Sequence, residues 1–276
     1  MESEVAFKRP PVVETVLGIQ FERLRGLTNA HLGAFWQSMQ AAWPRVNDAP
    51  PLEEQFETFG ERGAWARALR LKLTQSPSAR VQMRNERGDR MVQVQNCRLD
   101  YNWIARPEQA YPRYRTVRPE FDESLEAFRQ FVSKYSLGAL TPNQWEVAYV
   151  NHILKGTVWN DPQDWPEVLR SLPGLAAGPQ RTKLESFGGH WHYEIEPQVG
   201  RLHVEIQHSV VEEPAKEEAL VMKLTARGPI DAKEDPNGAI DRGLNLGHDV
   251  IVSAFRDVTS PQAHQYWNRE NQYAQS

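Results

Sequence analysis

"RVQMRNERGDRMVQVQN", residues 80–96, carries the clearest structural signal in the chain, because apolar and polar residues alternate on both sides of a turn. Alternation with a period of two is typical of a strand with one buried face. Gly88 in the segment ERGD can supply the positive φ of a tight turn. The pattern predicts a hairpin in which two pairs of apolar residues face each other: Val81 and Met83 with Val92 and Val94. The opposite face, which we expect to be exposed to solvent, holds Arg80, Gln82, Arg84, Gln93 and Gln95.

The alternation continues in NCRLDYNWIA (96–105), but its phase changes. The apolar residues now stand at odd rather than even positions: Cys97, Leu99, Tyr101 and Trp103. A continuous strand with this pattern would turn the wrong residues toward the core. The sequence therefore predicts a bulge or break near residues 95–97.

Outward from this hairpin, the chain reads as two parts with the same order of elements. The first part comprises residues 1–138, with strands predicted over 10–24, 53–59, 66–73 and the hairpin, and helices over 28–44 and after the proline-containing link 106–119. The second part comprises residues 139–276, with strands predicted over 143–154, 182–196, 201–211 and 218–228, and helices over 161–174 and 245–259.

Each part thus follows the order strand, helix, three or four strands, helix. This order predicts an α+β fold in which an antiparallel sheet carries helices on one face, with the two parts joined in one unit. By element order it resembles the duplicated saddle of the TATA-box-binding protein, and less closely the helix-grip fold. Element order implies nothing about function.

The composition is that of an ordinary globular protein, with 40% hydrophobic and 25% charged residues and a net charge of −4. No apolar run approaches the roughly 20 residues that span a bilayer, and the first residues do not form a signal peptide. The single cysteine, Cys97, excludes an intramolecular disulfide. We therefore expect a cytoplasmic protein without a membrane partner.

Three phrases resemble a bacterial family of about this length whose members are scattered among genomes and whose function is uncharacterised. The phrases are PPVVETVLGIQF, YPRYRTVRPEF and GHDVIVSAFRDVTSPQAHQYW, in this order along the chain. Scattered distribution implies a context of mobile elements or defence genes. The resemblance carries over no catalytic residue.

The first candidate site is a basic surface on the hairpin and its continuation. Between Arg62 and Arg118, twelve Arg and one Lys stand against four acidic residues, a net charge of +9. Arginines among aromatic residues are typical of single-stranded nucleic-acid binding. The alternative is that these arginines pair with acidic residues elsewhere in the fold. The candidate binding residues are Arg80, Gln82, Arg84, Arg87, Arg90 and Arg98.

The second candidate is the segment GGHWHYEIEPQVGRLHVEIQH (188–208). A turn centred on residues 197–200 would place Glu194 opposite His203 and His192 opposite Glu205. Imidazole and carboxylate are ligands that zinc prefers, so a metal-dependent hydrolase site is one interpretation. The other is a pair of cross-strand contacts on a solvated sheet face.

The third candidate is DRGLNLGHDVIVSAFRD (241–257), where Arg242 and His248 stand close to the expected start of the last helix. Free backbone amides at a helix start bind anions, so an anion site is one interpretation. Helix capping is the other.

Sequence motifs of the common enzyme classes are missing: there is no GxSxG, no Walker-type loop and no GxGxxG after a strand. We therefore expect a non-catalytic protein without a cofactor that recognises a protein partner. Nucleic-acid or polyanion binding by the segment Arg62–Arg118 is the first alternative, and the metal-dependent hydrolase is the second.

Overall fold

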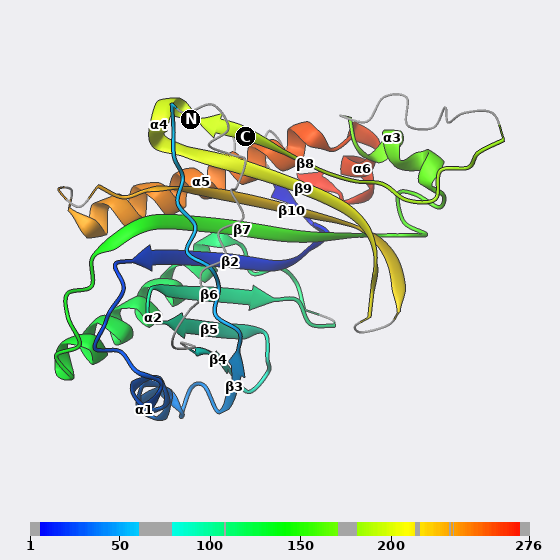
Figure 1. Ribbon diagram of the computed structural model, residues 1–276. Coiled ribbons are helices and arrows are strands. Elements are labelled where there is room, and N and C mark those ends of the chain that lie inside the picture. Colours follow the sequence, from blue (N-terminus) through cyan, green and yellow to red (C-terminus); the bar gives the residue numbers. More distant parts are fainter. Residues whose placement is uncertain are drawn as a thin grey trace, which may run out of the picture.

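The computed structural model describes residues 6–60, 79–107, 109–170, 181–212, 216–231, 233 and 235–270. In this part of the chain, nine strands form one open antiparallel sheet in the order β3-β4-β5-β6-β2-β7-β10-β9-β8 (Figure 1). Helices α1, α2 and α5 pack against one face of the sheet. The predicted fold class, α+β with an antiparallel sheet, is confirmed.

The first part of the chain supplies five strands and two helices to this arrangement. They are β2 (Val12–Phe21), α1 (Asn29–Met39), β3 (Arg45–Ala49), β4 (Arg80–Arg84), β5 (Arg90–Gln95), β6 (Arg98–Ile104) and α2 (Tyr114–Lys134). Thr28 is the N-cap residue of α1.

The second part supplies four strands of the sheet and the longest helix. Its elements are β7 (Pro142–Leu154), η1 (Pro162–Asp164), α3 (Trp165–Val168), β8 (Gly188–Ile195), the turn α4 (Glu196–Val199), β9 (Gly200–Val211), β10 (Glu217–Pro229), α5 (Pro236–Val258) and α6 (Pro261–Tyr266). A two-stranded sheet joins β1 (Ala6–Phe7) to β11 (Arg269–Glu270). No helix in the described residues is long and apolar enough to cross a membrane.

The central pair of strands, β2 and β7, comprises the first long strand of each part. The last strand of each part flanks this pair, with β6 beside β2 and β10 beside β7. In Figure 1 the strands on the β2 side of the sheet are blue to blue-green, and those on the far side of β7 are in shades of yellow.

The hairpin β4–β5 has the predicted register, with Val81 opposite Val94 and Met83 opposite Val92. The change of phase after Gln95 is a break and not a bulge, because β5 and β6 are joined by the two-residue turn 96–97. Val94 then lies opposite Leu99. Even positions in one strand and odd positions in the next thus point toward the same core.

The packing of α5 on β7 depends on glycine. Trp145 and Val147 of β7 are buried beneath the helix. A Cβ on Gly243 would overlap the indole ring of Trp145, and a Cβ on Gly247 would stand 2.9 Å from both Trp145 and Val147. The helix can approach the sheet this closely because two of its turns carry no side chain on this side.

Several predicted boundaries are wrong. Residues 53–59 form no strand, and β3 lies before them. The strand predicted over 66–73 lies outside the described residues, and the one predicted over 182–196 begins only at Gly188. Helix α2 begins at Tyr114, inside the predicted link, and it contains Pro119 in its second turn, where the helix loses one backbone hydrogen bond. Helix α5 begins at Pro236, since Asp235 caps its first free amides.

Candidate functional site

The sheet face opposite helices α1, α2 and α5, which we name the polar face, holds the candidate site. Along β7, Trp145, Val147 and Tyr149 point toward the helices, so the alternate residues Glu146, Ala148 and Val150 point away. A cavity of about 670 Å³ lies on this face and is lined by residues of seven strands and of the segment 52–57. This volume is within the range of ligand-binding clefts, roughly 300–1,000 Å³.

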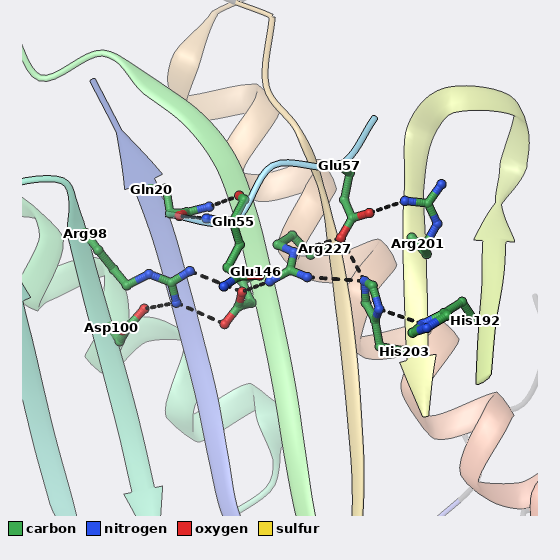
Figure 2. Close-up of polar contacts among 10 residues, drawn as sticks. All are labelled: Gln20, Gln55, Glu57, Arg98, Asp100, Glu146, His192, Arg201, His203 and Arg227. Carbon is green, nitrogen blue, oxygen red and sulfur yellow. Dashed lines mark hydrogen bonds and ion pairs between the residues drawn. The ribbon is translucent and has the colours of Figure 1, made fainter. Parts of the chain in front are cut away.

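The centre of the polar face is an ion-pair network around Glu146 (Figure 2). Arg98 binds Glu146 with both terminal nitrogens, at 3.0 and 3.2 Å, and Arg227 reaches the same carboxylate at 3.0 Å. Burial alone would raise the pKa of Glu146, but the charges of Arg98 and Arg227 lower it to about 2. Asp100 lies at 3.4 Å from Arg98, and burial raises the pKa of its carboxyl to about 6 against the attraction of that arginine.

A second group of charges lies around Glu57, which comes from the segment Pro50–Gly60, hereafter the strap. Glu57 accepts hydrogen bonds from Arg201, from Arg227 at 2.9 Å and from His203 at 2.7 Å. Burial would raise the pKa of Glu57, but the His203 hydrogen bond and the Arg227 charge lower it to about 2. Nδ1 of His203 lies 2.8 Å from Nδ1 of His192, so one of these two imidazoles donates a hydrogen bond to the other.

The strap crosses the polar face in an extended path and is held through its backbone (Figure 2). The amide of Gln95 accepts from the Leu52 N–H at 2.8 Å and donates to the Leu52 carbonyl at 2.9 Å. Gln20 makes the same pair of contacts with Gln55, accepting from its N–H at 2.7 Å and donating to its carbonyl. Two glutamines of the sheet therefore bind peptide main chain as a neighbouring strand would.

A chain of side-chain amides ends at Glu14 in the cavity. Arg80 donates to Gln93 at 2.7 Å, Gln93 donates to Asn102 at 2.8 Å, and Asn102 donates to Glu14 at 2.7 Å. Burial raises the pKa of Glu14, and the hydrogen bond from Asn102 opposes this rise. Every amide in this chain has a fixed orientation, so the polar floor of the cavity is preorganised.

The basic surface predicted on the hairpin is not a solvated patch. Arg98 is only 5% exposed, so the prediction that places it on an open surface is wrong. Its guanidinium is buried because two carboxylates compensate its charge. Gln93 and Gln95 are buried as well, since the polar face in this region lies beneath the strap.

The other predicted residues of this surface are mostly paired within the fold. Arg90 binds Glu120 at 2.6 Å and Asp89 at 3.1 Å, both as ion pairs. Arg80, Gln82 and Arg84 are partly buried, and Arg87 is exposed. Arg62 lies outside the described residues. Arg90 and Arg98 therefore fit the alternative interpretation, in which the arginines pair with acidic residues of the fold and do not form a phosphate-binding surface.

The register predicted for the β8–β9 hairpin is wrong by two residues. The turn lies at residues 196–199, so His192 faces His203, His190 faces Glu205, and Glu194 faces Arg201. Its tight geometry places Glu196 and Gln198 at positive φ, which the sequence did not indicate. Glu194 accepts from the Gln198 amide at 2.9 Å and is exposed, away from His203. Among the described residues, no three His, Cys, Asp or Glu side chains are placed to hold a metal ion.

Arg242 and His248 do not stand at a helix start, which was the basis of the anion site predicted there. Both residues lie in the interior of α5, where backbone amides bond within the helix, and Asp235 already accepts from the amides of Asn237 and Gly238 at its start. The ring of His248 stacks on Tyr114 with a centroid distance of 4.1 Å and contacts the Tyr149 hydroxyl at 2.8 Å. His248 is a buried packing residue of α5 that contacts β7 and α2.

Most residues of the polar-face network have no place among the sequence-predicted sites. They are Glu14, Glu57, Asp100, Glu146, Arg201 and Arg227. The available signal was a charged residue between large apolar residues, as in WEV around Glu146. A charged side chain in a central strand requires a partner of opposite charge on the same face of the sheet. The identity of that partner depends on strand order.

No protein-family model matches this chain, and comparison with curated proteins finds no match either.

Proposed function

We propose that this chain is a non-catalytic binding protein that recognises an extended segment of a protein partner on its polar face. The observation that carries the proposal is the pairing of Gln20 and Gln95 with both the N–H and the carbonyl of a strap residue. Recognition of main chain in this way is independent of side-chain identity and resembles strand addition at a sheet edge. The strap occupies one stretch of the face, and the cavity continues beyond it.

The charge of the cavity favours a polypeptide over nucleic acid. Six acidic and four Lys or Arg side chains are among the residues that line it. A phosphate backbone requires an excess of positive charge, whereas a polypeptide can offer both signs. We also propose that the protein is cytoplasmic. We propose that its gene belongs to a mobile element or defence locus, and the identity of the adjacent genes tests this.

Selection of displayed random peptides against the immobilised protein tests the proposal. Enriched peptides are then titrated against the wild type and against Val150→Trp, which fills the cavity from β7. We expect at least about tenfold weaker binding to this variant, corresponding to about 1.4 kcal/mol.

The matched control is Tyr135→Ala, an exposed residue at the end of α2, which should bind the same peptides as the wild type does. Absence of enriched peptides, or peptides whose affinity is unchanged by Val150→Trp, would contradict the proposal.

A further inference from the structure

Three side chains of the sheet enclose the Glu57 carboxylate, and we name them the carboxylate cage: Arg201, Arg227 and His203. Arg201 binds one carboxylate oxygen, whereas Arg227 and His203 bind the other, at 2.9 and 2.7 Å (Figure 2). The Glu57 side chain is only 4% exposed. The cage therefore donates hydrogen bonds to both oxygens of a carboxylate.

The cage belongs to the sheet, but its occupant does not. Arg201 of β9 lies directly opposite Arg227 of β10, and His203 lies opposite Thr225. Like charges directly opposite each other on neighbouring strands destabilise a sheet. The pairing of β9 with β10 thus places two arginines side by side, and an anion between them stabilises this arrangement, whichever segment supplies the anion.

The strap that carries Glu57 is held mainly by polar contacts. Residues 51–59 form no regular secondary structure. Of their three large apolar residues, Leu52 and Phe56 are 36% and 54% exposed, and Phe59 is partly buried with its ring 5.0 Å from the Arg201 guanidinium. Segments that bury little apolar surface open at a small fraction of the global unfolding free energy. The sheet below them, with Val204 and Leu224 fully buried, is the stable partner in this contact.

We propose that the carboxylate cage is a binding site for an acidic side chain of a partner polypeptide, and that Glu57 fills it from within the chain when that partner is absent. This inference rests on the proposed function and names the chemistry of the partner: an extended acidic segment. The strap has this chemistry itself, since PPLEEQFETF (50–59) contains Glu53, Glu54 and Glu57. The partner segment replaces the strap and takes over its contacts with Gln20, Gln95 and the cage.

A carboxylate suits the cage better than a phosphate group. Glu146 stands 3.0 Å from Arg227, so a negative charge is already present beside the cage. It repels a phosphate monoester, which carries close to two negative charges, more than a singly charged carboxylate. The phosphodiester chain of a nucleic acid would also meet the six acidic side chains that line the cavity. Acidic polypeptide is therefore the expected occupant, and nucleic acid is an outcome that the experiment can detect.

The full-length Glu57→Ala variant tests whether the cage binds free carboxylates. Acetate replaces the atoms that this substitution removes, so we expect a saturable rise in its melting temperature of about 2–4 °C. Sodium chloride at equal ionic strength and neutral acetamide should give no such rise. The wild type and Glu53→Ala, whose cages are filled, should not respond to acetate either. The proposal is overturned if acetate acts no better than chloride on Glu57→Ala.

A fluorescein-labelled peptide of residues 49–60 tests the partner chemistry in the same variant. We expect it to bind Glu57→Ala at least about tenfold more tightly than a peptide with Gln in place of Glu57, because only the carboxylate is fully paired in the cage. Because these changes are in the peptide, they cannot affect folding of the protein. A peptide with Gln in place of Glu53 is the matched control and should bind as the unchanged peptide does.

Equal affinity of the Glu and Gln peptides, or preferential binding of an oligothymidylate, overturns the proposal. These outcomes leave the proposed function intact if selected peptides still depend on Val150. If selected peptides bind Val150→Trp as tightly as the wild type, but acetate still stabilises Glu57→Ala, the proposed function is contradicted and the carboxylate-binding cage is not.

Discussion

The carboxylate of Glu57 lies 2.7 Å from Nε2 of His203, although the two residues are 146 positions apart in the chain. Glu57 comes from a segment without regular structure, and His203 comes from the middle of β9. This contact joins the two parts of the chain across the polar face. The network that it belongs to gives three predictions, and the packing of α5 on the other face of the sheet gives a fourth.

Removal of Arg98 should strongly destabilise the fold. Arg98→Met leaves the buried carboxylates of Asp100 and Glu146 without their shared cation, and loss of one partner in such a group costs roughly 3–5 kcal/mol. Urea unfolding at pH 7 measures the change. The exposed Arg87→Met is the control and should stay within about 0.5 kcal/mol of the wild type. Similar midpoints for the two variants would show that the network contributes little.

Stability should fall as the pH decreases below about 4.5. The folded-state pKa values of Glu57 and Glu146 are both about 2, below their ordinary value of 4.5. The folded protein therefore binds fewer protons, and the stabilisation is complete above pH 4.5 and lost as the pH falls toward 2. Urea midpoints between pH 2.5 and 7 should decline less steeply for Glu57→Gln. The exposed Glu53→Gln should keep the wild-type slope, and parallel curves for Glu57→Gln would contradict the assignment.

Asp100 should have the opposite pH dependence. Burial raises its pKa from 3.8 to about 6, so the folded protein binds the proton more readily than the unfolded chain does. Its contribution is complete below pH 3.8 and is lost as the pH rises through 6. The Asp100→Asn variant cannot ionise, so its stability relative to the wild type should increase between pH 4 and 7. Chemical denaturation at each pH gives this difference, and a difference independent of pH would refute the expectation.

The contact between α5 and β7 should be sensitive to one methyl group. Gly243→Ala would place a Cβ against the ring of Trp145, and overpacking of this kind costs roughly 1–3 kcal/mol. Gly33 provides a matched control, because it lies in α1 and a Cβ there would meet no atom within 4 Å. Gly33→Ala should stabilise the protein by up to about 1 kcal/mol through helix propensity. Thermal unfolding of both variants gives the comparison, and equal effects would exclude close packing at Gly243.

The sequence by itself predicted the fold class and the core. Alternation in residues 80–104 predicted the hairpin register and a bulge or break near Gln95, and it placed Val81, Met83, Val92 and Val94 on one buried face. These predictions hold because strand periodicity and burial are local properties of the chain. Helix boundaries failed where a cap or a tolerated proline outweighed local propensity, as at Asp235 and Pro119.

The candidate site could be decided only by the tertiary structure. Sequence periodicity places Arg98 and Glu146 on faces of their own strands, but it does not show that β6 and β7 flank β2, which brings the two residues together. A one-residue difference in the centre of the turn at residues 196–199 changed the cross-strand partner of His192 from Glu205 to His203. The strand predicted over residues 53–59 of the strap does not form, and nothing local predicts that Glu57 reaches Arg201. Ion pairs between distant segments depend on strand order and register, and these are determined by the packing of the whole sheet.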